Sequence, residues 1–511
     1  MKGIVPRFGP WIAGGIGYFL GVYQLEYGWV SPASAGLAVL ALLVTTMGVE
    51  KLSTATAAEG RRGLRKRRLS FMSQLIAENP FPDHVNAPSA PIHAALFMET
   101  MPTVDEIVAV TDDILLPHDR FACPVVAVPP TLLEEGFLAW GPRPGTPDWA
   151  YHVVEDRVGS EDELMAYCQP LVGEELDESR PLWQIRLVKV ADSCRGLLLL
   201  RISHVVGDGV SLVHTLISLL THGDGSAYTL PPFQRRAVAA APSLAARAAA
   251  AVKLGFGTLR AAFKVVTLPA GPADSPNALK RSLAGWVRPQ AYRLVRTRKI
   301  AVERLKKIKN ALGATINDVM AAGLARAARA YLAQVGDPVV DDASPLLRVF
   351  LPYAFTQRSK VLTNKWCFLS LKLPLADMSP QAALAEVKAE IDALKSTPEA
   401  HLQFYLQQLA SAVLPTAPRK QTALDTMLSH TLVFTNVPGP PTPVYCAGHK
   451  VDEVIVYIGN LISQVSALSY NGNVTVTFAL DADVIEDPEK LAACFEAAID
   501  ELEAAACGDG Q

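Results

Sequence analysis

The sequence predicts an α/β protein built from two lobes, with a hydrophobic segment ahead of them. The chain has 511 residues, which exceeds one ordinary domain and suits two core-sized units. Half of the residues are apolar and 19% are charged, so the chain is expected to fold rather than stay disordered. Strand-like runs such as Trp149–Val154 and Trp183–Val190 and helix-like runs such as Val302–Leu312 both occur, and their mixture indicates an α/β fold. Gly313 is expected to end that helix, and Ser469–Gly472 predicts a hairpin turn between two strands.

The stretch Leu197–Ser211 carries the strongest local pattern in the chain. It opens with a nearly continuous apolar run, which is typical of a strand buried on both faces. The run ends at His204, and Asp208 follows between Gly207 and Gly209, the residue type used where backbone bends sharply. Helix-like apolar spacing then resumes. The predicted local structure is therefore a strand, an imidazole, a tight loop and a helix.

An imidazole held at a strand end is suited to proton transfer. Histidine is the side chain whose unperturbed pKa lies near working pH, so it can take up and return a proton. Asp208 is expected to hold the loop by pairing with a cation such as an arginine, without touching substrate. The alternative is a core histidine beside an ordinary Asp-Gly turn. The complete His-x-x-x-Asp-Gly pattern after a buried strand favours chemistry over that alternative.

His204–Gly209 resembles the His-His-x-x-x-Asp-Gly signature of the CoA-dependent acyltransferase superfamily. Within that superfamily, the sequence is most similar to the wax ester synthase/diacylglycerol acyltransferase family. The second histidine of the signature is the general base of that family, so the resemblance implies this role for His204. Ser203 stands where the family has the first histidine. This difference concerns the support of the base rather than the base itself.

Other blocks of this family occur in family order between Pro91 and Pro488, and their order is more specific than any single block. These blocks are Pro91–His93, Asp119–Phe121, Ser179–Ile185, Asn277–Arg281, Leu347–Pro352, Asn364, Val433–Pro440 and Ser469–Gly472. Thr363 stands before Asn364 where glycine is usual. The resemblance implies two lobes with mixed sheets, as in chloramphenicol acetyltransferase-like enzymes, and an active-site tunnel between them.

A further block, Asn317–Asp318, stands at the place of an Asn-Asp pair near the family's active site. Thr315 and Asp318 form a capping-box-like helix start, with aspartate in place of the usual glutamate. This start places Asn317 in the first turn, where backbone amides are free and the helix dipole is positive. We expect Asn317 to be a catalytic residue. A role confined to starting the helix is the alternative for both residues.

Two uncharged runs, Phe8–Tyr23 and Trp29–Val49, precede every block of the resemblance, and the second is long enough to span a bilayer. The basic run Arg61–Arg68 follows and indicates the cytoplasmic side of a membrane. We expect a membrane hairpin here; a cleaved signal peptide and a buried core helix are the alternatives. The expected organisation is 1–60 membrane-anchoring segments, 61–235 amino-terminal lobe with the His-x-x-x-Asp-Gly motif, 236–290 crossover helix and linker, and 291–511 carboxy-terminal lobe.

The resemblance implies an O-acyltransferase that moves a fatty acyl group from acyl-CoA to a lipid hydroxyl. The acceptor is a long-chain alcohol, which gives a wax ester, and/or a diacylglycerol, which gives triacylglycerol. In this role His204 accepts the hydroxyl proton, Asp208 holds the loop, and Asn317 is the candidate stabiliser of the oxyanion. Acyl-CoA is a co-substrate, and no cofactor is expected.

Membrane lipid is a further expected partner, because both the acceptor and the ester product dissolve in lipid. The expected location is a membrane, at the endoplasmic reticulum and/or a lipid droplet, with the lobes facing the cytoplasm. The segment Ser243–Val266 is rich in alanine with few charges and predicts a long helix. This helix either crosses between the lobes or lies on a membrane surface.

Composition and motifs exclude several other classes. A net charge of −3 gives no reason to expect a nucleic-acid partner. The seven cysteines are scattered without a Cys-x-x-Cys pair and no His-Glu-x-x-His occurs, so no metal site is expected. The sequence has no P-loop and no Gly-x-Ser-x-Gly elbow. Two alternatives stay open: an inert acyltransferase-fold scaffold on a membrane or lipid droplet, and an acyltransferase for another alcohol such as a sterol.

Overall fold

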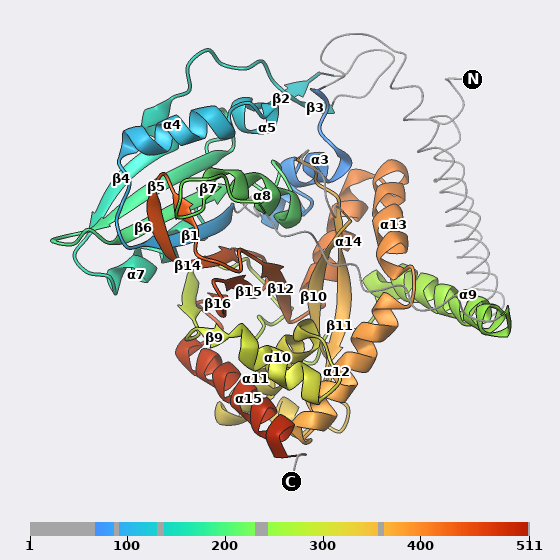
Figure 1. The fold of residues 1–511 in the computed structure, drawn as a ribbon. Coiled ribbons are helices and arrows are strands. Elements are labelled where there is room, and N and C mark those ends of the chain that lie inside the picture. The colour runs from blue at the N-terminus through green and yellow to red at the C-terminus, as the bar shows by residue number, and fades with distance from the viewer. Residues whose placement is uncertain (1–66, 86–90, 130–136, 230–243, 356–361, 509–511) are drawn as a thin grey trace.

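The computed structural model describes residues 67–85, 91–129, 137–229, 244–355 and 362–508. In these residues the chain forms two large mixed sheets with helices packed on them, one sheet in each lobe (Figure 1). This is the two-lobed α/β architecture predicted from the sequence. The predicted membrane hairpin within 1–60 lies outside the described residues.

Across the part of the chain that the structure describes, no helix is both long and apolar enough to cross a bilayer.

The first sheet has the strand order β4-β5-β6-β1-β14-β13-β7. Its strands are β1 Ile92–Met98, β4 Val153–Val158, β5 Trp183–Val190, β6 Gly196–Ile202, β7 Leu220–Thr221, β13 Tyr445–Cys446 and β14 His449–Ile458. A separate pair joins β2 Val125–Val128 to β3 Phe137–Trp140. Strands β4 and β5 run parallel, whereas β5, β6, β1 and β14 pair antiparallel in turn.

Strands β13 and β14 belong to the first sheet, although they lie within residues 291–511, which the sequence predicts to form the carboxy-terminal lobe. Strand β14 pairs with β1 from Ile92 opposite Ile458 onward. Its side chains alternate between buried and half-buried, which is the pattern of a strand with one face on a core. The chain therefore returns from the second lobe to complete the first sheet, so the two lobes are joined by more than one crossing of the chain.

The second sheet has the order β11-β10-β12-β15-β16-β8, and β9 also pairs with β16. Its strands are β8 Tyr292–Arg296, β9 Ile300–Ala301, β10 Leu347–Ala354, β11 Trp366–Leu373, β12 Leu432–Pro438, β15 Gln464–Tyr470 and β16 Asn473–Asp481. Strands β10, β12 and β15 run parallel to one another, and the outer pairs are antiparallel.

Helices cover both sheets (Figure 1). In the first lobe and the connection they are α3 Phe71–Ala77, α4 Val104–Ile114, α5 Asp119–Ala122, α6 Trp149–His152, α7 Glu163–Leu171, α8 Gly209–Leu216 and α9 Leu244–Thr267. In the second lobe they are α10 Val302–Ala311, α11 Ile316–Gln334, α12 Pro380–Lys395, α13 Glu399–Val413, α14 Thr416–Leu428 and α15 Pro488–Gly508. Helix α11 lies at the centre of the second lobe, and most of its side chains are buried in the largest core cluster.

Several local predictions are confirmed. The strand predicted over Trp183–Val190 is β5, and the Trp183 side chain is 1% exposed with its indole N–H donating to the Phe121 carbonyl (2.7 Å). Gly313 follows α10 with a positive φ of 62°, which glycine adopts without steric cost. The turn at Asn471-Gly472 has positive φ at both residues, as a two-residue hairpin between β15 and β16 requires.

One local prediction is wrong. The run from Trp149 to Val154 has strand-like composition, but residues Trp149–His152 form the short helix α6 and the strand starts at Val153. Asp148 caps this helix, because its carboxylate accepts a hydrogen bond from the Tyr151 amide (3.3 Å). The cap overrides the β propensity of the aromatic residues that follow.

Two blocks that stand apart in the sequence lie side by side in the second sheet. Strand β12 ends with Pro438 in register with Ser469 of β15, and the Gly439 amide donates to the Ser469 carbonyl (3.0 Å). A Cβ atom at Gly439 would lie 2.4 Å from that carbonyl oxygen. Only glycine allows the two backbones to approach this closely, which accounts for the glycine in the Asn-Val-Pro-Gly-Pro block.

Candidate active site

His204 lies just beyond the carboxyl end of β6, where the strand turns into the loop before α8. All seven residues of β6 are buried. The turn forms because the Ser203 amide still donates to the Leu182 carbonyl (3.0 Å), while the Val206 amide donates back to the Ser203 carbonyl (3.0 Å). The imidazole is thus carried on the end of a rigid central strand, as the sequence predicted.

The surroundings of the His204 ring favour its neutral form. The side chain is partly exposed, yet the protein around it removes enough water to lower the pKa below the usual 6.5, against a smaller opposing effect of the Asp208 charge. Its Nδ1 atom is buried and has no hydrogen-bond partner among the described residues. A neutral imidazole at neutral pH is able to accept a proton.

Asp208 does not pair with an arginine, and this corrects the expectation from the sequence. Its carboxylate accepts backbone hydrogen bonds from Ser211 (2.9 Å), as the cap of α8, and from Lys365 (3.0 Å) in the second lobe. The side chain is 1% exposed. Among the described residues no arginine lies within ion-pair distance of it. Backbone N–H groups from both lobes take the place of the expected cation, so Asp208 joins the loop to the second lobe.

Arg120 is close enough for the charge of Asp208 to act on it, but it holds the same loop in another way. Its guanidinium donates to the Val206 carbonyl (2.8 Å) and to the Ser73 hydroxyl (3.5 Å). Burial lowers the pKa of Arg120, and the charge of Asp208 acts in the opposite direction. Arg120 therefore stabilises the loop through a backbone carbonyl, and the interaction with Asp208 is one of charge at a distance.

Residues at the start of β11 hold His204 from the opposite lobe. The Asn364 side chain, 1% exposed, donates to the His204 carbonyl (2.6 Å) and accepts from the Trp366 indole N–H (2.9 Å). The Trp366 ring lies against the imidazole, with centroids 5.1 Å apart and planes inclined by 43°. The sequence marked Asn364 as a block of the resemblance, but nothing in the local pattern pointed to Trp366.

Asn317 is placed as predicted on its own helix, but it does not contact His204. Thr315 and Asp318 form the predicted capping box, with hydrogen bonds of 2.8 and 3.3 Å between them. The Asn317 amide oxygen accepts from the Asn436 side chain (2.6 Å) at the end of β12. Within the described residues no hydrogen bond links Asn317 to His204 or Asp208. The structure therefore joins His204 and Asp208 in one loop and places Asn317 beside a different block.

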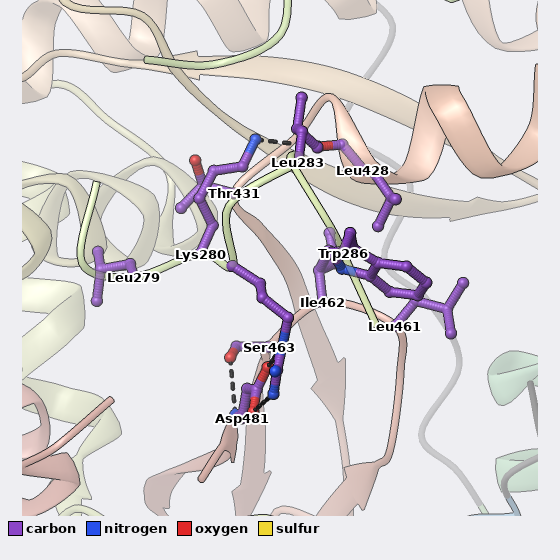
Figure 2. Close-up of a pocket in the computed structure, with 11 residues that line it drawn as sticks. Leu279, Lys280, Leu283, Trp286, Leu428, Thr431, Leu461, Ile462, Ser463 and Asp481 are labelled. Atoms are coloured by element: carbon purple, nitrogen blue, oxygen red, sulfur yellow. Dashed lines mark hydrogen bonds and ion pairs between the residues drawn. The ribbon is translucent and has the colours of Figure 1, made fainter. Parts of the chain in front are cut away.

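Figure 2 shows a pocket in the second lobe, and none of these residues lines it. It is lined by Leu279, Lys280, Arg281, Leu283, Trp286, Leu428, Thr431, Leu461, Ile462, Ser463 and Asp481. Arg281 binds the Asp481 carboxylate through two hydrogen bonds (2.8 and 2.7 Å), and Lys280 donates to the Leu428 carbonyl (2.9 Å). These contacts fasten this segment to β16 of the second sheet and to α14, which gives the Asn277–Arg281 block a structural role. Among the described residues no cluster of three or more His, Cys, Asp or Glu side chains is placed to hold a metal ion.

Two models of one protein family match the chain. The wax ester synthase/diacylglycerol acyltransferase catalytic domain matches residues 131–320, and the C-terminal domain of the same family matches residues 362–503. The chain belongs to the wax ester synthase/diacylglycerol acyltransferase family. It is accordingly an acyltransferase. The two matched regions include His204, Asp208 and Asn317 in the first and the Asn364–Trp366 segment in the second.

Individual relatives agree with this membership. A putative diacylglycerol O-acyltransferase of Mycobacterium tuberculosis is 26% identical over 395 residues, which cover 70% of this chain and 77% of that protein. The structure of a wax ester synthase/diacylglycerol acyltransferase from Marinobacter aquaeolei superposes with a TM-score of 0.55 at 18% identity, covering 86% of this chain and 100% of that one. The starter condensation domain of rhizomide synthetase, in complex with C8-CoA, gives 0.54 at 13% identity, covering 86% and 95%. At these identities the structural matches show the fold.

In this acyltransferase, Ser203 supports the turn rather than the imidazole. Its hydroxyl is buried and accepts a hydrogen bond from the Val205 amide (3.2 Å). We expect Ser203→Ala to keep most of the activity, since one such bond contributes only about 0.5–1.5 kcal/mol. Ser203→His should lower the melting temperature, because the larger ring enters a packed site at a cost of about 1–3 kcal/mol. Turnover and thermal unfolding of both variants check this, and complete loss of turnover in Ser203→Ala would assign the serine a role in catalysis.

Trp366 is expected to hold the His204 ring in place. We expect Trp366→Ala to lower kcat by about ten- to a hundredfold, because a loosened general base spends less time in the reactive geometry. The same change admits water to the ring, so the pKa of His204 should rise toward its usual value and the acid limb of the pH profile should move up. Trp366→Phe keeps an aromatic ring and serves as the conservative control. An unchanged acid limb in the alanine variant would contradict this role.

Proposed function

We propose that this acyltransferase moves a fatty acyl group from acyl-CoA to the hydroxyl of a long-chain alcohol and/or a diacylglycerol, with His204 as the general base. The observation that supports this most is the placement of His204 at the end of a buried strand, where Asn364 and Trp366 hold it from the other lobe and burial lowers its pKa. The names of the Mycobacterium and Marinobacter relatives support the acceptors, and the C8-CoA complex of the condensation domain supports the donor.

The proposed reaction needs no covalent acyl-enzyme. The neutral His204 imidazole takes the hydroxyl proton as the alcohol oxygen attacks the thioester carbonyl, which forms a tetrahedral intermediate. When the intermediate collapses, the carbon–sulfur bond breaks and the imidazolium gives its proton to the departing CoA sulfur. The products are the ester and free CoA, and the imidazole is neutral again.

Two further groups have assigned roles in this proposal. Asp208 positions the loop that carries the base by joining it to α8 and to the second lobe. Asn317 is the candidate oxyanion stabiliser, since its amide stands in the first turn of α11 and its oxygen is already held by Asn436, which orients the group. The developing negative charge is therefore proposed to form on the side of the second lobe.

A lipid surface is the proposed location, because the acceptor and the product both partition into lipid. The relatives named above come from bacteria, which have no endoplasmic reticulum. These relatives do not support a location at the endoplasmic reticulum, and we propose a lipid surface without assigning it to an organelle.

The proposal is tested with purified full-length protein and labelled acyl-CoA. Parallel reactions contain a long-chain alcohol, a diacylglycerol, a sterol or no acceptor, and labelled ester is separated from labelled acyl-CoA and free fatty acid. We expect ester with the long-chain alcohol, the diacylglycerol or both. Ester with the sterol alone would replace the acceptor in the proposal. Absence of ester with every acceptor would overturn the proposed function.

The lowered pKa of His204 predicts a specific pH dependence. A base whose pKa lies below 6.5 is still mostly neutral at pH 6.5, so the acid limb of kcat/KM should be centred below 6.5. The free energy of unfolding should also fall as the pH drops through about 6.5. The unfolded chain takes up protons near pH 6.5, whereas burial lowers the pKa of His93 and of His430 to about 3 in the folded chain. An acid limb of kcat/KM centred at or above 6.5 would contradict the assignment of His204.

A further inference from the structure

Helix α9 presents an apolar stripe to solvent. Leu259, Phe263 and Val266 are 48%, 55% and 42% exposed. They stand about one helical turn apart, so they lie on the same face of the helix. Large apolar side chains exposed singly are ordinary, but three in a row on one helix face form a surface suited to contact with another apolar phase.

The other side of α9 is already used in packing. Ala261, Ala262 and Val265 are buried together with Leu402 of α13, and Figure 1 shows the two helices side by side at the edge of the molecule. Lys264 ties the helix to the second lobe through an ion pair with Glu399 (2.8 Å). The exposed stripe is therefore held in a definite direction, away from the lobe on which the helix rests.

The sequence segment that contains α9 carries charge of one sign. Between Asp224 and Asp274 the chain contains no aspartate or glutamate, although these residues make up 50 of the 511 positions. Over the same interval it contains Arg235, Arg236, Arg247, Lys253, Arg260 and Lys264. Arg260 is exposed and adjoins Leu259 of the stripe. An apolar stripe flanked by the exposed Arg260, on a segment without carboxylates of its own, matches the boundary between the headgroups and acyl chains of an anionic bilayer.

We propose that α9 is an interfacial helix that lies in the surface of an anionic lipid membrane, with Leu259, Phe263 and Val266 among the acyl chains. The apolar side chains gain from leaving water, and the basic side chains gain from the negative surface. The packed alanine face keeps the second lobe in contact with that surface. The inference is independent of the reaction, and together with the proposed function it places the enzyme on the phase that dissolves its acceptor and product.

The experiment reads the stripe directly in the full-length chain. The exposed cysteines are removed as Cys194→Ser and Cys507→Ser, and a nitroxide spin label is attached at Phe263→Cys, with Leu259→Cys as a second position on the stripe. Val335→Cys is the matched control, since Val335 is also apolar and 39% exposed but follows α11. Collisions of the label with oxygen, which concentrates in lipid, and with a water-soluble nickel chelate are measured with and without vesicles.

With vesicles of phosphatidylcholine and phosphatidylglycerol, we expect a several-fold loss of nickel collisions and a gain of oxygen collisions at the stripe positions, and no change at the control. Vesicles of phosphatidylcholine alone should give a smaller response because the basic residues lose their partner. An equal response to both vesicles would overturn the anionic surface. A label that is shielded from nickel before lipid is added would show that the chain's own residues or a second copy cover the stripe. No response at either stripe position would overturn the proposal.

Discussion

His204→Ala should abolish ester formation in a protein that remains folded. General base catalysis contributes about a hundred- to ten-thousandfold to rate, and the nearby Asp208 carboxylate is occupied by the Ser211 and Lys365 amides. The fold should survive because the ring makes no hydrogen bond through its buried Nδ1 atom and β6 is held by its strand partners. The measurement is kcat with labelled acyl-CoA, accompanied by thermal unfolding of the same preparation.

The matched control for this variant is His214→Ala. His214 lies on α8, two turns beyond the loop, and is half-buried like His204. Removing it should leave kcat within about twofold of the parent, because a change distant from the reacting atoms alters mainly stability. Near-normal turnover in His204→Ala would make this histidine structural and would remove the general base from the proposed mechanism. Unfolding of His204→Ala, with His214→Ala folded, would contradict the expectation that the His204 ring is dispensable for the fold.

Asp208→Ala should cost both stability and activity. The change removes the cap of α8, worth about 1 kcal/mol, and leaves the Lys365 amide without its acceptor at a cost of about 1–3 kcal/mol. We expect a total loss of about 2–4 kcal/mol, seen as a shift of the denaturant midpoint. Turnover should fall as well, since the loop that carries His204 is then joined less firmly to the second lobe.

Two variants separate the parts of this effect. Asp208→Asn keeps an oxygen that can cap α8 but turns an N–H group toward the Lys365 amide, so it should be intermediate in stability. Ser379→Ala removes an equivalent cap from α12, where the Ser379 hydroxyl accepts from Ala382 (3.2 Å) far from the loop, and should cost about 1 kcal/mol with normal turnover. Loss of turnover in Asp208→Ala at an unchanged midpoint would mean that the carboxylate takes part in the chemistry directly.

Helix caps, turns and strand periodicity were predictable because their causes lie within a few residues. The capping box at Thr315 and Asp318, the hairpin turn at Asn471-Gly472 and the strand over Trp183–Val190 all appear as expected. The short helix at Trp149–His152 was missed, although its cap is equally local. There the aromatic composition pointed to a strand, and the cap at Asp148 proved the stronger influence.

The two-lobed α/β class and the histidine at the end of a buried strand could be predicted from the sequence alone. What holds that histidine depends on contacts between distant segments of the chain. The amide that Asp208 binds belongs to Lys365, 157 residues away, and the carbonyl of His204 is bound by Asn364, 160 residues away. Strand β14 likewise enters the first sheet from the far end of the chain. Periodicity and capping act over one or two turns of backbone, whereas these contacts exist only because the packing of the two lobes brings distant segments together.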